Sequence, residues 1–198
     1  YMKKVIITIG REFGSGGREI GLKLSEKLGI PFYDKELIVH TAEKTNIEPS
    51  VVERYDEQHS FPAFSSSNVF DIYQMPMSDR IYIAQADVIR DIAKEGSCII
   101  VGRCADFILD KDPDCFKVFI TAPMKAKVER KRHILEGKTD REIEAHITKI
   151  DKKRSKYYTY YTDRTWGKST TYHLCVDSSV LGIDGTVDLI IHAVNMKR

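Results

Sequence analysis

One stretch near the start of the chain constrains the fold most, because it joins a strand pattern to a glycine-rich turn and a helix pattern. Residues 5–9 read VIITI, an apolar and β-branched run that predicts a parallel strand buried on both faces. The turn that follows carries glycines at four positions, Gly10, Gly14, Gly16 and Gly17. Ile20, Leu24 and Leu28 then recur at helical spacing, and Gly29 stands where a glycine commonly ends a helix. This order predicts a phosphate cradle, because glycines let backbone N–H groups turn toward an anion and a helix N-terminus adds partial positive charge.

The turn departs from the nucleotide-binding pattern G-x-x-x-x-G-K-[ST] at its end. When the pattern is aligned on Gly16, Gly17 stands in the lysine position, and Arg18 and Glu19 follow where the pattern has a hydroxyl residue, so no Ser or Thr is available there for magnesium. Arg18 could supply the missing cation, because a guanidinium group binds phosphate at least as readily as an ammonium group. The alternative is a tight turn whose glycines serve only close packing. The predicted nucleotide-binding residues are Gly10, Arg11, Gly14, Ser15, Gly16, Gly17, Arg18 and Glu19.

Composition limits the class of protein. The chain has 198 residues, 42% of them hydrophobic and 30% charged, which is typical of one soluble globular domain. Its net charge of +2 gives no argument for nucleic-acid binding, and no apolar stretch approaches the length of a membrane span. The cysteines lack CxxC spacing and are typical of reduced thiols in a cytoplasmic protein, and the histidines lack metal-ligand spacing. We therefore expect no bound structural metal, nucleic acid or membrane, and find no signal of an oligomeric state.

Strand and helix patterns alternate along the rest of the chain. The predicted strands lie at 30–34, 98–101, 116–120 and 173–176, and the predicted helices at 35–44, 81–94, 124–136, 139–157 and 183–194. They predict an α/β fold, a doubly wound parallel sheet of about five strands with helices on both faces. We interpret 1–198 as a single domain. Its core spans about 1–47 and 81–198, a mobile insert spans about 48–80, and a helical basic lid spans about 137–170.

Three further groups of residues could carry chemistry. Arg103 ends a buried strand, where open α/β sheets bind ligands, and its guanidinium group suits a monophosphate; the alternative is a structural pair with Asp106. Residues 151–156 read DKKRSK and could clamp phosphates, although a run of charge is also typical of a solvated helix face. The acid and serines of residues 177–179 are more typical of a helix cap than of a direct role.

Taken together, these motifs resemble the cytidylate kinase-like family of P-loop nucleoside monophosphate kinases. The points of similarity are residues 9–20 (IGREFGSGGREI), 101–103 (VGR), 152–158 (KKRSKYY) and 172–174 (YHL). The resemblance implies that the chain is a single P-loop kinase-like domain with an acceptor-site insert at about 48–80. It also implies that the loop binds ATP with Mg²⁺ and that the γ-phosphoryl group passes to CMP or dCMP. It also implies that Arg103 holds the acceptor monophosphate and that Arg154, with Lys153, bridges the donor and acceptor phosphates. Cys104 stands where the family has an acid that reads cytosine.

These considerations define two sets of candidate residues besides the loop. The predicted catalytic residues are Arg18, Asp151, Lys153 and Arg154. The predicted substrate-binding residues are Asp34, Lys35, His40, Gln85, Arg103 and Cys104. Asp34 and Asp151 are the acids placed to orient Mg²⁺, its waters or a lid arginine. Two alternatives stay open: a kinase that acts on another small molecule, and a nucleotide-binding regulator that has lost catalysis, which Gly17 and Glu19 would suit.

Overall fold

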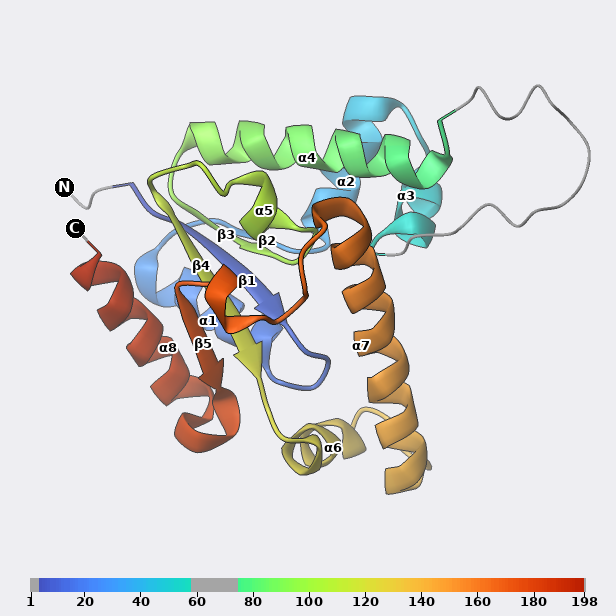
Figure 1. Ribbon diagram of the computed structural model, residues 1–198, viewed down its shortest axis with the longest axis vertical. Coiled ribbons are helices and arrows are strands. Elements are labelled where there is room, and N and C mark those ends of the chain that lie inside the picture. Colours follow the sequence, from blue (N-terminus) through green and yellow to red (C-terminus); the bar gives the residue numbers. More distant parts are fainter. Residues whose placement is uncertain (1–3, 58–74, 198) are drawn as a thin grey trace, which may run out of the picture.

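The structure is a computed structural model that describes residues 4–57 and 75–197. In these residues a sheet of five parallel strands forms the centre of the molecule, in the order β2–β3–β1–β4–β5 (Figure 1). The strands are β1 (Ile6–Arg11), β2 (Phe32–Tyr33), β3 (Cys98–Val101), β4 (Cys115–Thr121) and β5 (Leu174–Asp177). Because β1 is central, the loop that follows it opens at the middle of the sheet's carboxyl edge. The predicted doubly wound parallel sheet is confirmed.

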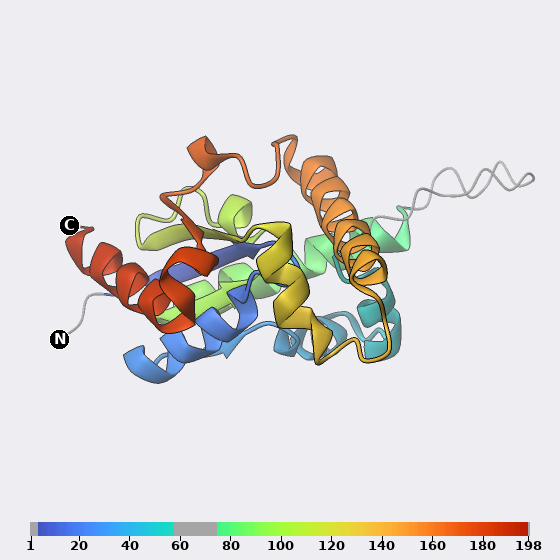
Figure 2. The ribbon, with the colours of Figure 1, turned by 90° about the horizontal axis from the view of Figure 1, so that it is seen from below.

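Helices cover both faces of this sheet (Figures 1 and 2). The helices α1 and α8 pack on one face, and α4 and α5 pack on the other beside α2. The helices are α1 (Gly17–Leu28), α2 (Glu36–Thr45), α3 (Pro49–Tyr55), α4 (Met77–Glu95), α5 (Ala105–Ile108), α6 (Met124–Arg132), α7 (Asp140–Thr162) and α8 (Ser178–Met196), with a 3₁₀ turn η2 (Ser169–Thr171).

Strand β1 shows how the core is divided. Ile7 and Ile9 point into the core under α1 and α8, where they meet Ile20 of α1. Ile6 points the other way, into the core under α4, where it packs with Ile89. All five side chains are fully buried or nearly so. A strand buried on both faces is apolar throughout, which is why its sequence shows a continuous run and no alternation.

The helices α6 and α7 form a hairpin that extends beyond the sheet's carboxyl edge (Figures 1 and 2). A capping box starts α7: the Thr139 side chain accepts from the backbone N–H of Glu142, and the Glu142 side chain accepts from the backbone N–H of Thr139. The two helices share a small core of Val128, Ile143 and Ile147, against which Phe13 of the glycine turn packs. The predicted lid helix is therefore in contact with the predicted phosphate cradle.

Several helices differ from the sequence-based expectation. Helix α5 was not expected, and α4 begins at Met77, four residues before the expected start. Helix α3 lies within residues 48–80, where we found no helical periodicity; it is short, starts at a proline and buries only Val52, so it leaves little pattern to detect. Residues 58–74 of that predicted insert lie outside the described residues. Helix α8 begins at Ser178, five residues before the expected start, and is interrupted at Gly182 by a left-handed φ of 66°. Asp177 caps it by accepting from the backbone N–H of Ser179, as predicted for this turn.

Candidate active site

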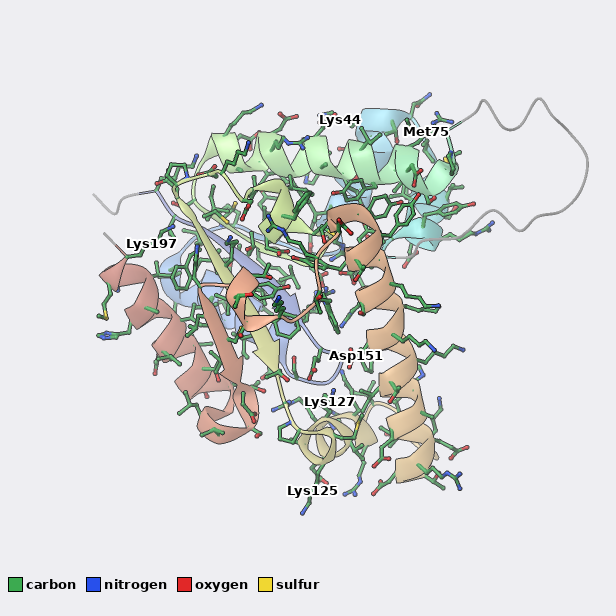
Figure 3. All side chains as sticks on the ribbon, viewed as in Figure 1. Lys44, Met75, Lys125, Lys127, Asp151 and Lys197 are labelled. Carbon is green, nitrogen blue, oxygen red and sulfur yellow. The ribbon has the colours of Figure 1, made fainter. Side chains whose placement is uncertain are left out.

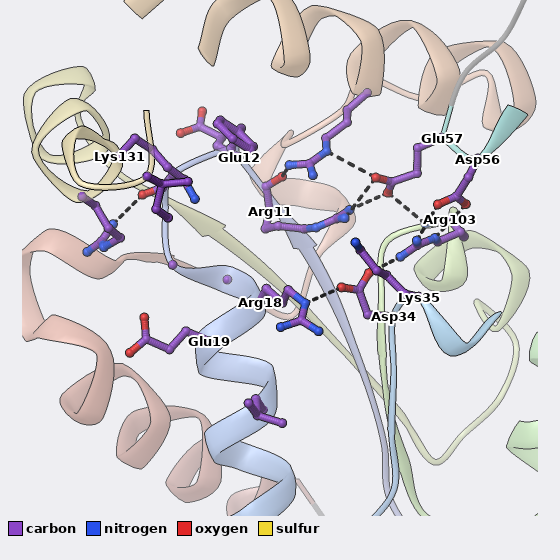
Figure 4. A pocket seen from close by; sticks show the side chains of 18 of the residues that line it. Arg11, Glu12, Arg18, Glu19, Asp34, Lys35, Asp56, Glu57, Arg103 and Lys131 are labelled. Carbon is purple, nitrogen blue, oxygen red and sulfur yellow. Dashed lines mark hydrogen bonds and ion pairs between the residues drawn. The ribbon is translucent and has the colours of Figure 1, made fainter. Parts of the chain in front are cut away.

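A cleft of about 580 Å³ opens at the carboxyl ends of β1, β2 and β3 (Figure 4). The glycine turn and the start of α1 form its floor, and the end of α3 and the α6–α7 hairpin supply its walls. Open parallel sheets bind ligands at this edge, because the loops that leave neighbouring strands diverge there. The cleft unites the loop with most of the charged residues that the sequence analysis selected.

The floor of the cleft is a turn that directs a helix N-terminus into it. Gly14 and Gly16 have φ of 86° and 83°, a left-handed conformation that glycine adopts without strain. Gly16 also caps α1, accepting the backbone N–H of Ile20 at 2.9 Å through its carbonyl oxygen. The N–H groups of the first turn of α1 have no partner within the helix and are available to an anion.

Gly17 is required by the side chain of Arg11, the last residue of β1. A Cβ atom at position 17 would lie 2.5 Å from Cβ of Arg11 and 3.0 Å from its Cγ. Real carbon atoms do not approach so closely, so a side chain at position 17 would have to displace Arg11 or the loop. The absence of lysine at the usual place in the loop therefore has a steric cause in this chain.

Arg103 follows β3 and is almost fully occupied by hydrogen bonds. Its Nε donates to Oδ1 of Asp56 at 3.0 Å and its Nη2 to Oδ2 of the same residue at 2.6 Å. Its Nη1 donates to a carboxylate oxygen of Asp34 and to the carbonyl oxygen of Val101. The side chain is only 3% exposed, and the two acids raise its pKa against the opposing effect of burial. The predicted alternative partner, Asp106, instead accepts from the Tyr158 hydroxyl at 2.6 Å.

Glu57, just after α3, is held by two further arginines. Arg11 Nη1 and Nη2 donate to its two carboxylate oxygens at 2.5 and 3.0 Å, and Arg154 Nε lies 3.3 Å from Oε2 (Figure 4). The backbone N–H of Arg103 also donates to Oε1 at 3.3 Å. Burial alone would raise the pKa of Glu57, but Arg11, Arg103 and Arg154 outweigh it and hold that pKa well below its usual range. Arg154 reaches the site from α7 and also donates to the carbonyl oxygen of Arg11.

Asp34, at the carboxyl end of β2, connects the arginines to the helix that follows the loop. Arg18 Nε donates to its Oδ2 at 2.7 Å, and Arg103 Nη1 bonds its Oδ1. The carboxylate is buried, which opposes ionisation, but Arg103, followed by Arg11 and Arg18, lowers its pKa overall. The Arg18 side chain remains 56% exposed and lies at the cleft surface.

Lys127 of α6 was not predicted and is buried directly behind the loop. Its Nζ lies 3.1 Å from Oε2 of Glu12 and 3.2 Å from Oδ2 of Asp151 (Figure 3). Asp151 also accepts the backbone N–H of Phe13 at 2.6 Å, and Glu12 accepts the hydroxyl of Thr121 at 2.8 Å. Burial raises the pKa of Asp151, and the hydrogen bonds from Phe13 and Lys127 oppose this rise without cancelling it. Asp151 therefore ties the loop to α7 and does not line the cleft.

Two other cations of α6 line the cleft beside the loop. Arg130 Nη1 donates to the carbonyl oxygen of Gly14 at 2.6 Å, and Lys131 Nζ lies 4.6 Å above the ring of Phe13. Burial, together with the charges of Arg130 and Arg154, lowers the pKa of Lys131. The sequence showed that α6 is basic, but its spacing did not indicate which cations face the loop.

The structure brings together most of the predicted site residues and separates the others. Those that line the cleft are Arg11, Gly14, Gly16, Gly17, Arg18, Glu19, Asp34, Lys35, Arg103 and Arg154. Gly10 and Ser15 lie in the backbone of the cradle, where the Ser15 carbonyl oxygen accepts the Ser178 hydroxyl at 2.5 Å. Lys153 is exposed and lies outside the cleft lining.

The other predicted substrate-binding residues lie around the cleft. His40 is exposed on α2 beside Glu43 and does not line the cleft. Gln85 is buried behind the acids, where its Nε2 donates to Oδ1 of Asp56 at 3.0 Å. Cys104 is buried behind Arg103, and burial raises the pKa of its thiol.

Asp56 and Glu57 are the functional candidates that the sequence reasoning missed. They stand at the end of a segment without a period, and acids next to each other in such a segment are common on protein surfaces. Their buried arginine partners are recognisable only in the folded chain. There β1 and β3 are neighbouring strands, and their ends bring Arg11 and Arg103 side by side.

The central glycine turn, the parallel strand order and the cationic hairpin define a P-loop kinase fold. The sequence model of the cytidylate kinase-like family matches residues 6–180, and the chain belongs to that family. A crystal structure of an uncharacterized protein from Eubacterium ventriosum is similar at 30% identity, with a TM-score of 0.75 and coverage of 98% of this chain and 99% of that one.

More distant crystal structures share the fold. Shikimate kinase from Bacteroides thetaiotaomicron has 17% identity and a TM-score of 0.58, over 98% of this chain and 100% of that one. A gluconokinase from Sinorhizobium meliloti has 14% identity and a TM-score of 0.51, over 98% and 91%. No curated protein sequence matches the chain significantly. In the part of the chain that the structure describes, no helix has the length and apolar character that crossing a membrane requires.

Proposed function

We propose that the protein is a kinase that transfers the γ-phosphoryl group of ATP to a small phosphate-bearing acceptor, with the nucleoside monophosphates CMP and dCMP as the first candidates. The observation that carries the proposal is the convergence of Arg11, Arg18, Arg103 and Arg154, from four separate elements, on the cleft above the glycine turn. Phosphoryl transfer requires positioned cations and little covalent chemistry from the protein.

The donor half of the cleft fits the phosphates of ATP. The N-terminus of α1 points into it, and Arg130 and Lys131 line it. Arg18 is exposed there and is the candidate substitute for the loop lysine. In this assignment ATP supplies the group transferred, and these residues hold and neutralise its phosphates.

Mg²⁺ would be held mainly by the nucleotide phosphates and water, as is usual for this ion with nucleotides. Within the described residues no group of three or more acids, histidines or cysteines could hold a metal by itself. Neither Arg18 nor Glu19, which follow Gly17, offers the hydroxyl group that binds the ion in the usual loop, and Asp34 is already bonded to two arginines. Asp34 therefore orients Arg18 and Arg103.

The acceptor half is the side with Asp34, Lys35 and Arg103. Arg154 reaches it from α7, so closing the α6–α7 hairpin would place a cation between donor and acceptor and exclude water. Cys104, buried behind Arg103, offers no acid to read cytosine, so the base preference has to be measured.

The test is a coupled assay of ADP release with ATP and Mg²⁺. The acceptor panel consists of ribo- and deoxyribonucleoside monophosphates, with shikimate and gluconate added because kinases of similar fold are named for them. Acceptor-dependent turnover on a monophosphate supports the proposal and names the base.

Turnover only on shikimate or gluconate would mean that the acceptor is a hydroxy acid and not a nucleoside monophosphate. No turnover on any acceptor, with ATP binding retained in calorimetry, would instead favour a nucleotide-binding regulator, which Gly17 and Glu19 would suit. Loss of all ATP binding would contradict the assignment of the glycine turn.

A further inference from the structure

Glu57 has the surroundings of a bound anion. Three hydrogen bonds to its carboxylate come from two different elements: two from the guanidinium group of Arg11 at the end of β1, and one from the backbone N–H of Arg103 after β3. The guanidinium group of Arg154 on α7 completes the set. Arginine forks and backbone N–H groups arranged in this way are the usual ligands of phosphate oxygens.

The backbone beneath Glu57 is shaped for close approach of an oxygen atom. Gly102, Arg103 and Cys104 are consecutive residues with positive φ of 76°, 52° and 56°. A Cβ atom at Gly102 would collide with both Oε1 of Glu57 and Nη1 of Arg11. A left-handed conformation at Arg103 and Cys104 costs free energy, and it presents the Arg103 N–H to the oxygen.

Glu57 follows Asp56, which has an extended backbone at the end of α3, and Glu57 itself has a left-handed φ of 49°. A single non-glycine residue in this conformation costs about 1 kcal/mol or more in general, and here it carries the carboxylate into the cluster of arginines. The side chain is 15% exposed at the cleft wall, so an incoming ligand can reach its position.

We propose that the guanidinium groups of Arg11 and Arg154 and the backbone N–H of Arg103 form an oxyanion subsite for the phosphate of the acceptor, and that the Glu57 carboxylate is its internal occupant, displaced when the acceptor binds. The subsite lies on the side of the cleft with Arg103 and Asp34, away from Lys131 (Figure 4). This assignment rests on the proposed function for the identity of the acceptor. The sequence analysis placed Arg11 among the nucleotide-binding residues, and the subsite assigns it to the acceptor instead.

The test is calorimetric titration of inorganic phosphate into the full chain, without nucleotide. Glu57→Gln removes the charge of the occupant and keeps its shape, so phosphate should bind at least about tenfold more tightly than to the wild type. Glu53→Gln is the matched control, because Glu53 lines the same cleft from α3 and no arginine contacts it in the described residues. Its phosphate affinity should equal that of the wild type.

Equal tightening in both variants would overturn the proposal, because the effect would then be general electrostatics. No tightening in Glu57→Gln would also overturn it and make Glu57 a fixed structural partner of the arginines. If Glu57→Gln fails to fold, Glu57→Asp withdraws the carboxylate by one methylene group and should still tighten phosphate binding by about threefold or more. An unchanged affinity in Glu57→Asp would count against the proposal.

Competition experiments on Glu57→Gln separate this inference from the proposed function. A nucleoside monophosphate should compete with phosphate, and ADP should leave the titration unchanged. Competition by ADP would overturn the acceptor assignment of the subsite. Tight phosphate binding without competition by any monophosphate would uphold the oxyanion subsite and overturn the nucleoside monophosphate as acceptor.

Discussion

Arg103 and Asp56 form a two-point ion pair in which Nε donates to Oδ1 at 3.0 Å and Nη2 donates to Oδ2 at 2.6 Å. The side chains are 3% and 12% exposed, so water screens the pair weakly. The pair joins the end of β3 to the end of α3, two elements that the sequence separates widely. This side of the cleft is therefore held in shape by charged groups that also line the cleft.

Replacing Asp56 should destabilise the fold strongly. Asp56→Asn leaves the buried guanidinium group of Arg103 short of its main counter-charge, and breaking such a pair costs about 3–5 kcal/mol. Urea denaturation measures the loss. The control is Asp91→Asn, which breaks exposed pairs with Lys44 and Lys94 and should cost much less. Equal losses in the two variants would contradict the buried network.

A lysine placed at position 17 should not restore a conventional loop. Gly17→Lys forces Cβ against Arg11, and overpacking of this kind costs about 1–3 kcal/mol. Gly17→Ala should show a similar loss, because the clash arises at Cβ. Adding Arg11→Gly, which removes both Arg11 carbon atoms that a Cβ at position 17 would meet, should recover part of the stability in thermal unfolding; Arg11→Ala keeps the nearer Cβ and should recover less. A Gly17→Lys variant as stable as the wild type would show that the backbone at these two positions can move apart freely.

Lys127 should fasten the glycine turn to the hairpin. Lys127→Met leaves Glu12 and Asp151 without their shared cation, and the expected loss of stability is about 3 kcal/mol. Hydrogen exchange at the Phe13 amide, which donates to Asp151, should become faster. Lys125→Met is the control on the same helix, where the side chain is exposed, and it should leave both measurements unchanged.

Arg18→Ala should lower turnover far more than stability. The Arg18 side chain is 56% exposed, and one bond to Asp34 is lost, so the melting temperature should move little. Loss of a cation that contacts the transferring phosphates should reduce kcat by about 100-fold or more. Lys23→Ala, further along the same helix, should leave kcat unchanged. An Arg18→Ala variant with wild-type kcat would exclude Arg18 as the lysine substitute.

The arginine network should make the protein sensitive to acid. The pKa of Glu57 is lowered from its usual 4.5, so the folded state favours the ionised form. This stability is present above the unfolded pKa and is lost as the pH falls below it toward the lowered folded pKa. The free energy of unfolding of Glu57→Gln should therefore decrease less than that of the wild type as the pH falls from about 5 to 2.

Asp106 should show the opposite sign, because burial raises its pKa in the folded state. Its ionisation opposes folding, so protonation of Asp106 adds stability as the pH falls through that raised value. Asp106→Asn should remove this gain. Identical pH profiles for Glu57→Gln, Asp106→Asn and the wild type would contradict both assignments.

The sheet and most helices were predictable because their patterns are local. The run at 98–101 is apolar throughout and the run at 116–120 is apolar except for Lys117, and Gly29 and Gly96 end helices where expected. Helix α3 was not predictable, because a two-turn helix that buries one valine leaves no period. The strand order places β1 in the centre, and only that arrangement brings Arg11 beside Arg103.

The site was predictable where one motif carries it and unpredictable where partners come from distant elements. The glycine turn and Arg103 follow strands, so sequence alone placed them at the cleft. Lys127 behind the loop, and Asp56 and Glu57 in the cleft wall, meet their partners only through tertiary packing. Neither charge spacing nor composition distinguishes these three residues from surface residues. The same holds for Lys153, whose neighbour Arg154 faces the site while Lys153 faces solvent.

The close approach of Gly17 to Arg11 also limits the order in which such a loop can change. Because a Cβ at position 17 collides with the Arg11 side chain, the effect of any substitution at one position depends on the residue at the other. The nearest atom is the Cβ of residue 11, which every residue but glycine carries, so a side chain at position 17 requires either glycine at position 11 or a shift of the loop backbone. The two positions are therefore epistatic, and a single substitution cannot convert this loop into the kind that carries a lysine.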